Sequence, residues 1–174
     1  MSILSLFKKK QKSAEHFLEL IDVNRGLLWE AIADFKENLQ AINGTVTHHT
    51  DEMQEVFPVT HHLKDGLYTR ELFMPKDSLV VSFIHLTNHP SFFMKGEMSI
   101  LMDNGEIKRI KAPMVVQTEV GTQRVAYMHE DCVWACVYRT DKKTVEEAEK
   151  DVYTENYMDL PEHIILNKQL LCQD

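Results

Sequence analysis

The sequence FIHLTNHPSFFMKG, residues 83–96, contains two apolar runs with His85 and His89 at their junction. If both runs are β-strands, a short bend between them carries the two imidazoles. Gly96 then marks a sharp turn after the second run, because glycine accepts backbone angles that other residues avoid. We therefore predict that His85 and His89 lie beside a pocket at the mouth of a small β-barrel.

The residues on both sides of this segment form further short apolar runs separated by turn signals. The runs expected to be strands are residues 67–74, 78–85, 91–102, 107–111, 114–118, 124–128 and 131–140. Asn104-Gly105 is a strong hairpin signal because it accepts the positive φ that a tight reversal needs. In the last run, alternation places Trp134 on one face and Val133 and Val137 on the other. With the run 91–102 turning sharply at Gly96, these runs amount to about eight short strands with no helix between them, which predicts an antiparallel sandwich or barrel.

Both ends of the chain carry helical patterns. In residues 13–42 the large apolar residues recur at intervals typical of one face of a helix. Thr144 can cap an acidic helix after the last strand, and residues 163–172 are apolar enough to need cover. The predicted units are an N-terminal tail and amphipathic helix (1–44), a linker wrapping onto the barrel (45–66), the barrel (67–140), and an acidic helix with an apolar tail (141–174).

The composition indicates one folded domain, because 174 residues of which 44% are apolar can bury a sizeable core. A formal net charge of -8 argues against a general nucleic-acid or anionic-membrane binder, which needs a basic face. Cys132 and Cys136 would lie roughly 13 Å apart on a strand, too far for a disulfide, so we expect reduced thiols. No apolar run approaches the length of a membrane span, and the first residues lack the pattern of a secretory signal.

Several short motifs occur in the order typical of one family. They are PVTHHLKDGLYTREL (58–72), His89, Lys95-Gly96, Lys111-Ala112-Pro113, GTQRVAYMHED (121–131), Val133-Trp134 and Thr140-Asp141. On these residues, the region from 58 to 152 resembles the small cupin-like proteins found in genomes of tailed bacteriophages. The resemblance implies a single cupin-type double-stranded β-helix, that is, a jelly-roll barrel, and a viral origin. It does not extend to the N-terminal helix or to the C-terminal apolar tail.

Cupins that work as enzymes usually hold a divalent metal, and the resemblance locates their ligand positions here. Aligned on its glycine, the family's first motif places ligands at His89 and His85, and a third at Phe83, which cannot bind a metal. The histidine position of the second motif falls on Arg124, whose permanent charge repels a metal. Too few ligands remain for a zinc or iron site, which needs about three. No cofactor is favoured, and a divalent metal at His85, His89 and His129 stays open as the alternative.

A metal-free pocket fits these substitutions better. We predict that it is lined by His85, His89, Arg124 and Tyr127. Two imidazoles beside a guanidinium suit an anionic group, through charge-assisted hydrogen bonds. The alternative is that His85 and Arg124 pair with acids of the barrel itself, such as Glu71 and Glu119.

Two classes of function follow. The first is a non-enzymatic phage module for binding or assembly, which could be built into the virion. Its apolar extensions, residues 13–42 and 163–172, would pack against a second copy or other phage proteins. The alternative is an enzyme acting on an anionic or sugar-like substrate, either a metal-free epimerase or isomerase, or a metal-dependent oxygenase, which Phe83 and Arg124 disfavour. We expect the host cytoplasm or the virion as the location, and neither nucleic acid nor membrane as a partner.

Overall fold

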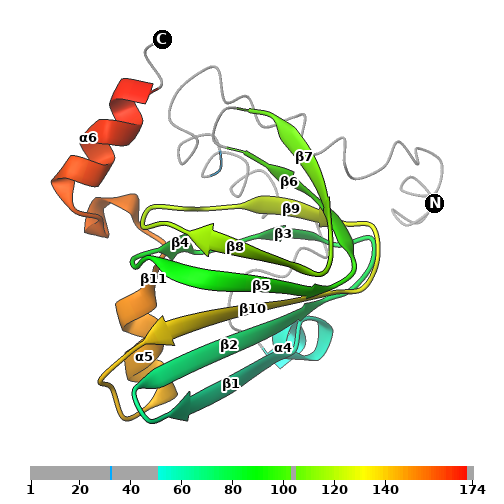
Figure 1. Ribbon diagram of the computed structural model, residues 1–174, viewed down its shortest axis with the longest axis horizontal. Coiled ribbons are helices and arrows are strands. Elements are labelled where there is room, and N and C mark those ends of the chain that lie inside the picture. Colours follow the sequence, from blue (N-terminus) through cyan, green and yellow to red (C-terminus); the bar gives the residue numbers. More distant parts are fainter. Residues whose placement is uncertain (1–31, 33–50, 103–104, 172–174) are drawn as a thin grey trace.

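The computed structural model of the protein describes residues 32, 51–102 and 105–171 (Figure 1). The elements, in chain order, are α4 (Asp51–Val56), β1 (Val59–Lys64), β2 (Leu67–Met74), β3 (Leu79–Val81), β4 (Ile84–His85), β5 (His89–Lys95), β6 (Glu97–Leu101), β7 (Ile107–Lys111), β8 (Met114–Thr118), β9 (Val125–Met128), β10 (Cys132–Arg139), α5 (Val145–Val152), β11 (Tyr153–Thr154), the 3-10 helix η2 (Tyr157–Asp159) and α6 (Glu162–Leu171).

Most of the strands pair as one long hairpin folded back on itself. β6 pairs with β7 at the closed end, and further out β5 pairs with β8, β3 with β9 and β2 with β10, always antiparallel. Two more pairings, β10 with β5 and β6 with β9, wrap the hairpin into two facing sheets (Figure 1). Their strand orders are β1-β2-β10-β5-β8 and β3-β9-β6-β7. Nested pairing wrapped into two sheets is a jelly roll of the cupin type, so the predicted fold is confirmed.

Alternate residues of each strand build the interior between the two sheets. On β10, Cys132 and Cys136 are buried in internal clusters and Trp134 packs against both clusters. The register places Trp134 opposite Leu72 of β2 and Phe93 of β5, so three large side chains meet in one layer. The predicted division of β10 into two faces is found, because strand geometry turns successive side chains to opposite sides.

Two of the predicted strands are interrupted. The run 91–102 divides into β5 and β6 at Gly96, whose φ is +96°. A Cβ atom there would lie 2.5 Å from the carbonyl oxygen of Asp131 and 2.6 Å from Sγ of Cys132, so only glycine fits. The run 78–85 divides into β3, which pairs with β9, and β4, which pairs with β11.

The prediction of a linker over residues 45–66 needs correction. Residues 45–50 lie outside the described residues, but the remainder forms α4 and β1. β1 pairs with β2 along its whole length, from Val59 opposite Leu72 to Lys64 opposite Leu67. Its side chains are mostly exposed because it is an edge strand, so it lacks the apolar alternation that marks a half-buried strand.

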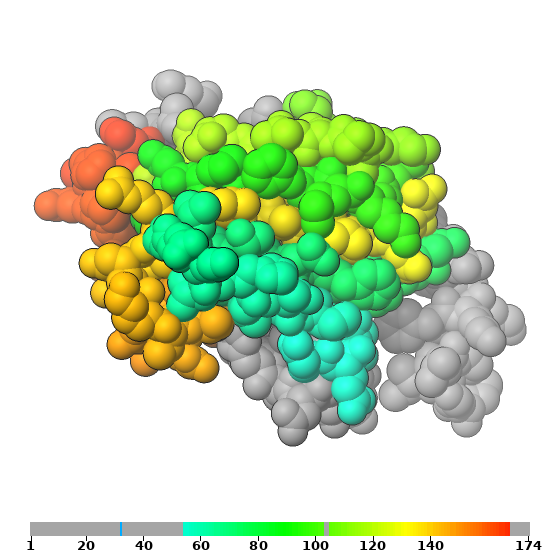
Figure 2. Space-filling view, turned by 60° about the horizontal axis from the view of Figure 1, so that its bottom comes forward, coloured from blue at the N-terminus to red at the C-terminus, as the bar shows by residue number. Residues whose placement is uncertain are grey.

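After β10 the chain folds around one end of the barrel. α5 begins at the predicted cap, where the Thr144 side chain accepts a hydrogen bond from the backbone N–H of Glu147. β11 then pairs with β4, which places Tyr153 directly opposite His85. Figure 2 shows the segment from α5 to α6, coloured orange to red, gathered at this end of the molecule.

The predicted N-terminal helix, residues 13–42, lies outside the described residues except for Ile32, which is helical and buried. The C-terminal apolar segment forms α6, and its residues Ile164 and Ile165 pack against the buried pair Ile84 and Leu160 of the same chain. None of the described helices is both long and apolar enough to cross a membrane.

Candidate functional site

A cavity of about 110 Å³ lies between the two sheets. Its apolar lining comprises Leu72, Met74, Val80, Val81, Phe83, Met98, Ile100, Ala126, Met128 and Trp134, and its polar lining comprises Arg70, Ser82, His85, Arg124, Cys136 and Tyr153. On β2, Arg70 lies opposite Cys136 and Met74 opposite Cys132, four residues along the strand. The two kinds of lining therefore occupy different ends of the cavity.

Arg70 enters the polar end from β2. Its Nε atom lies 3.5 Å from Oε1 of Glu149 on α5, within ion-pair range. That contact lacks hydrogen-bond geometry, and the buried Nε–H has no hydrogen-bond acceptor. The Arg70 guanidinium also lies 5.5 Å from the ring centre of Tyr153. Sequence reasoning missed Arg70, although strand alternation places it on the same face as Leu72 and Met74.

Arg124 reaches the same end from the opposite sheet, immediately before β9. Its Nη2 atom donates a hydrogen bond of 3.0 Å to Oγ1 of Thr118, a fully buried hydroxyl. Its guanidinium lies 5.7 Å from the ring centre of Trp134, which is cation–π range. Arg124 is therefore held from two sides, so that its charge has a defined position at the cavity wall.

The imidazoles of His85 and His89 are adjacent, with ring centres 4.8 Å apart, and both are buried. Nδ1 of His85 lies 3.3 Å from the Tyr138 hydroxyl. Nδ1 of His89 donates to the carbonyl oxygen of Thr87 at 2.9 Å, since a carbonyl can only accept. That proton position leaves Nε2 of His89 as a buried acceptor without a hydrogen-bond partner. His89 does not line the cavity but packs behind His85 and against Tyr138.

Two tyrosines complete the polar end. The hydroxyls of Tyr138 and Tyr153 lie 2.5 Å apart, so a chain of hydrogen bonds runs from Tyr153 through Tyr138 to His85. Burial raises the pKa of both phenols above their ordinary value, and they remain protonated at neutral pH. Each hydroxyl can therefore donate one hydrogen bond and accept another along the chain.

The electrostatics of this end keep the histidines neutral. Burial lowers the pKa of His85 to about 2, and His89, Arg124 and Arg70 act in the same direction. Burial also lowers the pKa of His89, assisted by Arg124 and opposed by the hydrogen bond to Thr87. Positive charge at the polar end is therefore carried by the two guanidiniums, while the imidazoles act as neutral hydrogen-bonding groups.

These residues do not fit a divalent metal. No group of three or more His, Cys, Asp or Glu side chains comes together among residues 51–102 and 105–171. Nδ1 of His85 and Nδ1 of His89 already have partners, which leaves at most one ring nitrogen of each imidazole as a ligand, and the guanidiniums of Arg70 and Arg124 would repel a cation at this point.

Of the four residues predicted to line the pocket, His85 and Arg124 line it and His89 stands behind His85. Tyr127 does not, because its neighbours Ala126 and Met128 face the cavity, and its hydroxyl donates to Oδ1 of Asp77 at 2.8 Å. The predicted place of Tyr127 in the pocket is therefore corrected.

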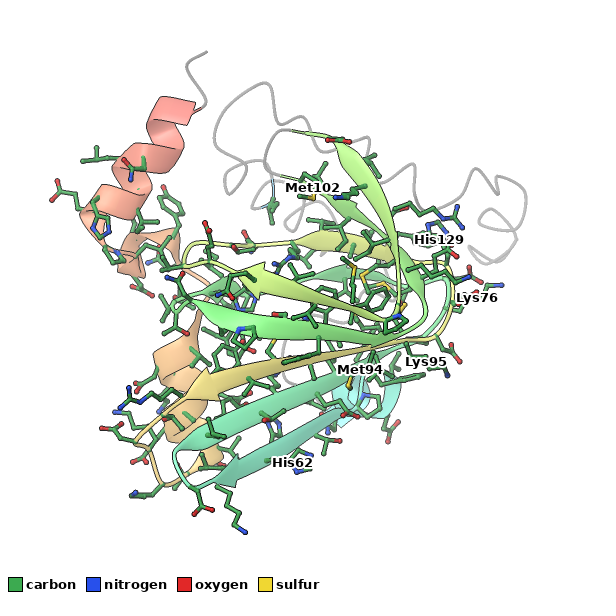
Figure 3. The ribbon with its side chains drawn as sticks, in the orientation of Figure 1. His62, Lys76, Met94, Lys95, Met102 and His129 are labelled. Carbon is green, nitrogen blue, oxygen red and sulfur yellow. The ribbon has the colours of Figure 1, made fainter. Side chains whose placement is uncertain are left out.

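His129, the third candidate metal ligand, also lies elsewhere. Its Nε2 atom is 2.8 Å from Oγ of Ser99, and its ring stands edge-on to Tyr127. Figure 3 shows His129 near Lys76 and Lys95, at the end of the barrel away from α5. It therefore cannot complete a site with His85 and His89.

Glu71 is an alternative ion-pair partner of His85 or Arg124 in the sequence-based prediction. It lies between Arg70 and Leu72 on β2. Both of those neighbours line the cavity, so strand alternation turns Glu71 to the outer face of the sheet. Pairing of Glu71 with His85 or Arg124 inside the barrel is thereby excluded.

Fold and cavity together define a single cupin-type barrel whose internal pocket carries two arginines. No family model matches the sequence, and no curated protein matches it. Solved structures with a similar backbone include ectoine synthase from P. lautus, at 12% identity over 62% of this chain and 86% of that chain, with a TM-score of 0.45. The cupin_2 domain of an XRE-family transcriptional regulator from Enterobacter cloacae matches at 12% identity over 50% of this chain and 99% of that chain, with a TM-score of 0.41.

An acetylacetone dioxygenase from Acinetobacter johnsonii also matches, at 12% identity over 56% of this chain and 77% of that chain, with a TM-score of 0.40. These structures include enzymes and a regulator. They therefore do not indicate a specific function for this chain.

Proposed function

We propose that this protein is a metal-independent binding module whose barrel takes up a small anion. The observation that carries the proposal is the charge of the cavity. Arg70 and Arg124 are its charged lining residues, and no acid is among the described residues that line it. Two guanidiniums facing a partly enclosed space favour an anion strongly, because hydrogen bonds between charged groups are about twice as strong as neutral ones.

The polar end is built for binding more than for proton transfer. A general base works best when its pKa lies near the operating pH. His85, with a pKa of about 2, holds a proton poorly at neutral pH, so it is a weak general base. The same neutral imidazole serves well as a fixed hydrogen-bonding group beside an anion held by the guanidiniums.

Calorimetric titration with sodium acetate and with sodium phosphate, each against sodium chloride at matched ionic strength, tests the proposal. At least one of the two anions should bind the protein, and the Arg124→Gln variant should bind it about tenfold more weakly, as loss of a charge-assisted hydrogen bond implies. Arg139→Gln is the matched control, because Arg139 is exposed on β10 and does not line the cavity. If neither anion binds, and carboxylates with a larger apolar body also fail, the proposal is wrong.

A second candidate is a metal-free isomerase or epimerase, favoured by the hydrogen-bonded chain from Tyr153 through Tyr138 to His85. Such a chain could deliver a proton to a substrate held at the polar end. Solvent exchange offers a direct test: a bound carboxylate with an acidic α-hydrogen should take up deuterium from D₂O in the presence of the protein, and Tyr138→Phe should abolish the uptake. If the carboxylate exchanges its α-hydrogen no faster with the protein than without it, the isomerase candidate is wrong and binding is the better-supported function.

We further propose, on the sequence resemblance alone, a phage origin and a role in assembly. Mass spectrometry of purified virions should then detect the protein in constant proportion to known capsid proteins. Its presence in infected cells together with its absence from virions would contradict a structural role in the particle.

A further inference from the structure

We infer that the anion is a small monocarboxylate with an apolar body, with its carboxylate at the Arg70–Arg124 end and its body among the methionines. The inference rests on the proposed anion-binding function and deepens it by naming the chemical class of the ligand.

The net charge of the polar end favours a ligand with one negative charge over a ligand with two. Among the described residues at the polar end, Arg70 and Arg124 contribute +2 and Glu149, which lies 3.5 Å from Arg70, contributes -1, so that the sum is 2 − 1 = +1. A monoanion balances that charge. A phosphate dianion would leave one buried negative charge uncompensated, which is unfavourable in a desolvated site.

Arg70 provides a specific docking point for the carboxylate. Its buried Nε atom lies 3.5 Å from Oε1 of Glu149 and its N–H has no hydrogen-bond acceptor, so the hydrogen-bonding capacity of this guanidinium is not filled by the chain itself. Arg70 comes from β2 and Arg124 from the loop before β9 in the facing sheet. A carboxylate with two oxygens between the two sheets can accept hydrogen bonds from both sides.

The other end of the cavity excludes sugar-like ligands. It is lined by Leu72, Met74, Met98, Ile100 and Met128, which offer a sugar hydroxyl no strong hydrogen-bond partner. Burying such hydroxyls without partners is unfavourable, whereas an alkyl group loses nothing there. Methionine side chains also adapt easily to the shape of an apolar guest.

The volume of the cavity limits the size of the ligand's apolar body. A cavity of about 150 Å³ accommodates benzene, which has six carbons. The cavity here measures about 110 Å³, which on the same scale holds about four non-hydrogen atoms, the size of a short alkyl body. 3-Methylbutanoate, an isobutyl group on a carboxylate, has seven non-hydrogen atoms. Its four-carbon body matches the volume, and because the cavity is only partly enclosed the remaining atoms can extend toward its opening, so this compound serves as the probe.

The full-length protein is titrated with 3-methylbutanoate, followed by calorimetry and by NMR of its ¹³C-methyl methionines. Four comparison compounds separate the parts of the ligand: 3-methylbutan-1-ol and 3-methylbutan-1-amine keep the body, and acetate and phosphate keep only the anion. 3-Methylbutanoate should bind at least about tenfold more tightly than each of these four. The methyl signals of Met74, Met98 and Met128 should shift, while those of the exposed Met94 and Met158 stay unchanged.

Arg70→Gln should weaken binding of 3-methylbutanoate by about tenfold, and Arg139→Gln should leave it unchanged. If Arg70→Gln fails to fold, the comparison of ligands on the unaltered protein still decides the question. The alcohol or the amine binding as tightly as the acid would overturn the inference. Acetate or phosphate binding equally well, without methionine shifts, would overturn it while leaving the proposed anion-binding function intact. No binding by any of the three anions would overturn both.

Discussion

Nε of Arg70 lies 3.5 Å from Oε1 of Glu149, which connects a side chain of the cavity to helix α5 outside it. The same glutamate accepts a hydrogen bond from the Tyr68 hydroxyl at 3.3 Å. Among the residues that the structure describes, Glu149 is the acidic side chain paired with Arg70 at this end of the cavity. It therefore competes with any bound anion for Arg70.

Removing that competitor should strengthen anion binding. We expect Glu149→Gln to bind 3-methylbutanoate up to about fivefold more tightly, since a partly exposed ion pair contributes about 0.2–1 kcal/mol. Glu146→Gln on the exposed face of α5 is the control and should not change the affinity. Calorimetry on both variants measures the effect, and weaker binding by Glu149→Gln would show that the glutamate positions Arg70 rather than competing for it.

The buried histidines predict loss of stability in acid. The ordinary pKa of histidine is 6.5, and folding lowers that of His85 to about 2, so between these values the unfolded chain binds a proton that the folded chain does not. The free energy of unfolding should therefore be fully retained above pH 6.5 and fall below it, by up to about 1.4 kcal/mol per pH unit from His85 alone. The pKa of His89 is shifted in the same direction and adds to the fall.

Urea unfolding at several pH values between 7.5 and 4.5 measures that slope. His85→Gln should flatten it by about 1.4 kcal/mol per pH unit, whereas His62→Gln, at an exposed position of β1, should leave it unchanged. Equal slopes in the His85→Gln variant and the unaltered protein would contradict the assignment of a buried neutral imidazole at this position.

Gly96 should tolerate no side chain. Gly96→Ala would force a Cβ to within 2.5 Å of the Asp131 carbonyl oxygen at a φ of +96°, and we expect a loss of about 2–4 kcal/mol in the free energy of unfolding. Gly66→Ala is a matched control: its φ is +84° but the nearest atom lies 3.7 Å away, so about 1 kcal/mol is expected. Comparable losses in the two variants would mean that close packing at Gly96 matters little.

The hydroxyls of Tyr138 and Tyr153 should be coupled energetically through their hydrogen bond. Each single change, Tyr138→Phe or Tyr153→Phe, leaves a buried polar atom without its partner and should cost about 1–3 kcal/mol. The double variant should lose less than the sum of the two, by about 1 kcal/mol, in a double-mutant cycle of urea unfolding. Strict additivity would show that the two hydroxyls do not interact energetically.

Self-association through the chain ends stays a prediction. On α6, Ile164 and Ile165 pack against the same chain, but Leu166 is 50% exposed. If α6 contributes to an interface, native mass spectrometry of the full-length protein should show an oligomer that Leu166→Glu weakens. Met158→Glu changes a similarly exposed residue on η2 and should have no effect. A monomer at micromolar concentration would exclude an assembly role for α6 in the isolated protein.

Much of the barrel was predictable because strands carry local signals. The runs at 67–74, 107–111 and 114–118 match β2, β7 and β8 to the residue, and Thr144 caps α5 as expected. Apolar alternation and turn residues report on each strand by itself, without reference to its partners. β1 lacked that signal, because an edge strand with exposed side chains is held by backbone hydrogen bonds that no residue pattern reveals.

The sequence by itself determined most strands of the barrel and predicted a pocket beside His85, since apolar alternation and turn residues are local signals; Arg124 and the incomplete metal motif followed from the resemblance to cupins. The sequence could not determine that Arg70 joins His85 and Arg124, or that Tyr127 and His129 do not. Those placements depend on which strands face each other and on which side chains turn inward, and nested pairing brings together residues more than fifty positions apart in the sequence. The neutral state of His85 likewise arises only from burial and from neighbouring charges, which exist only once the barrel has closed.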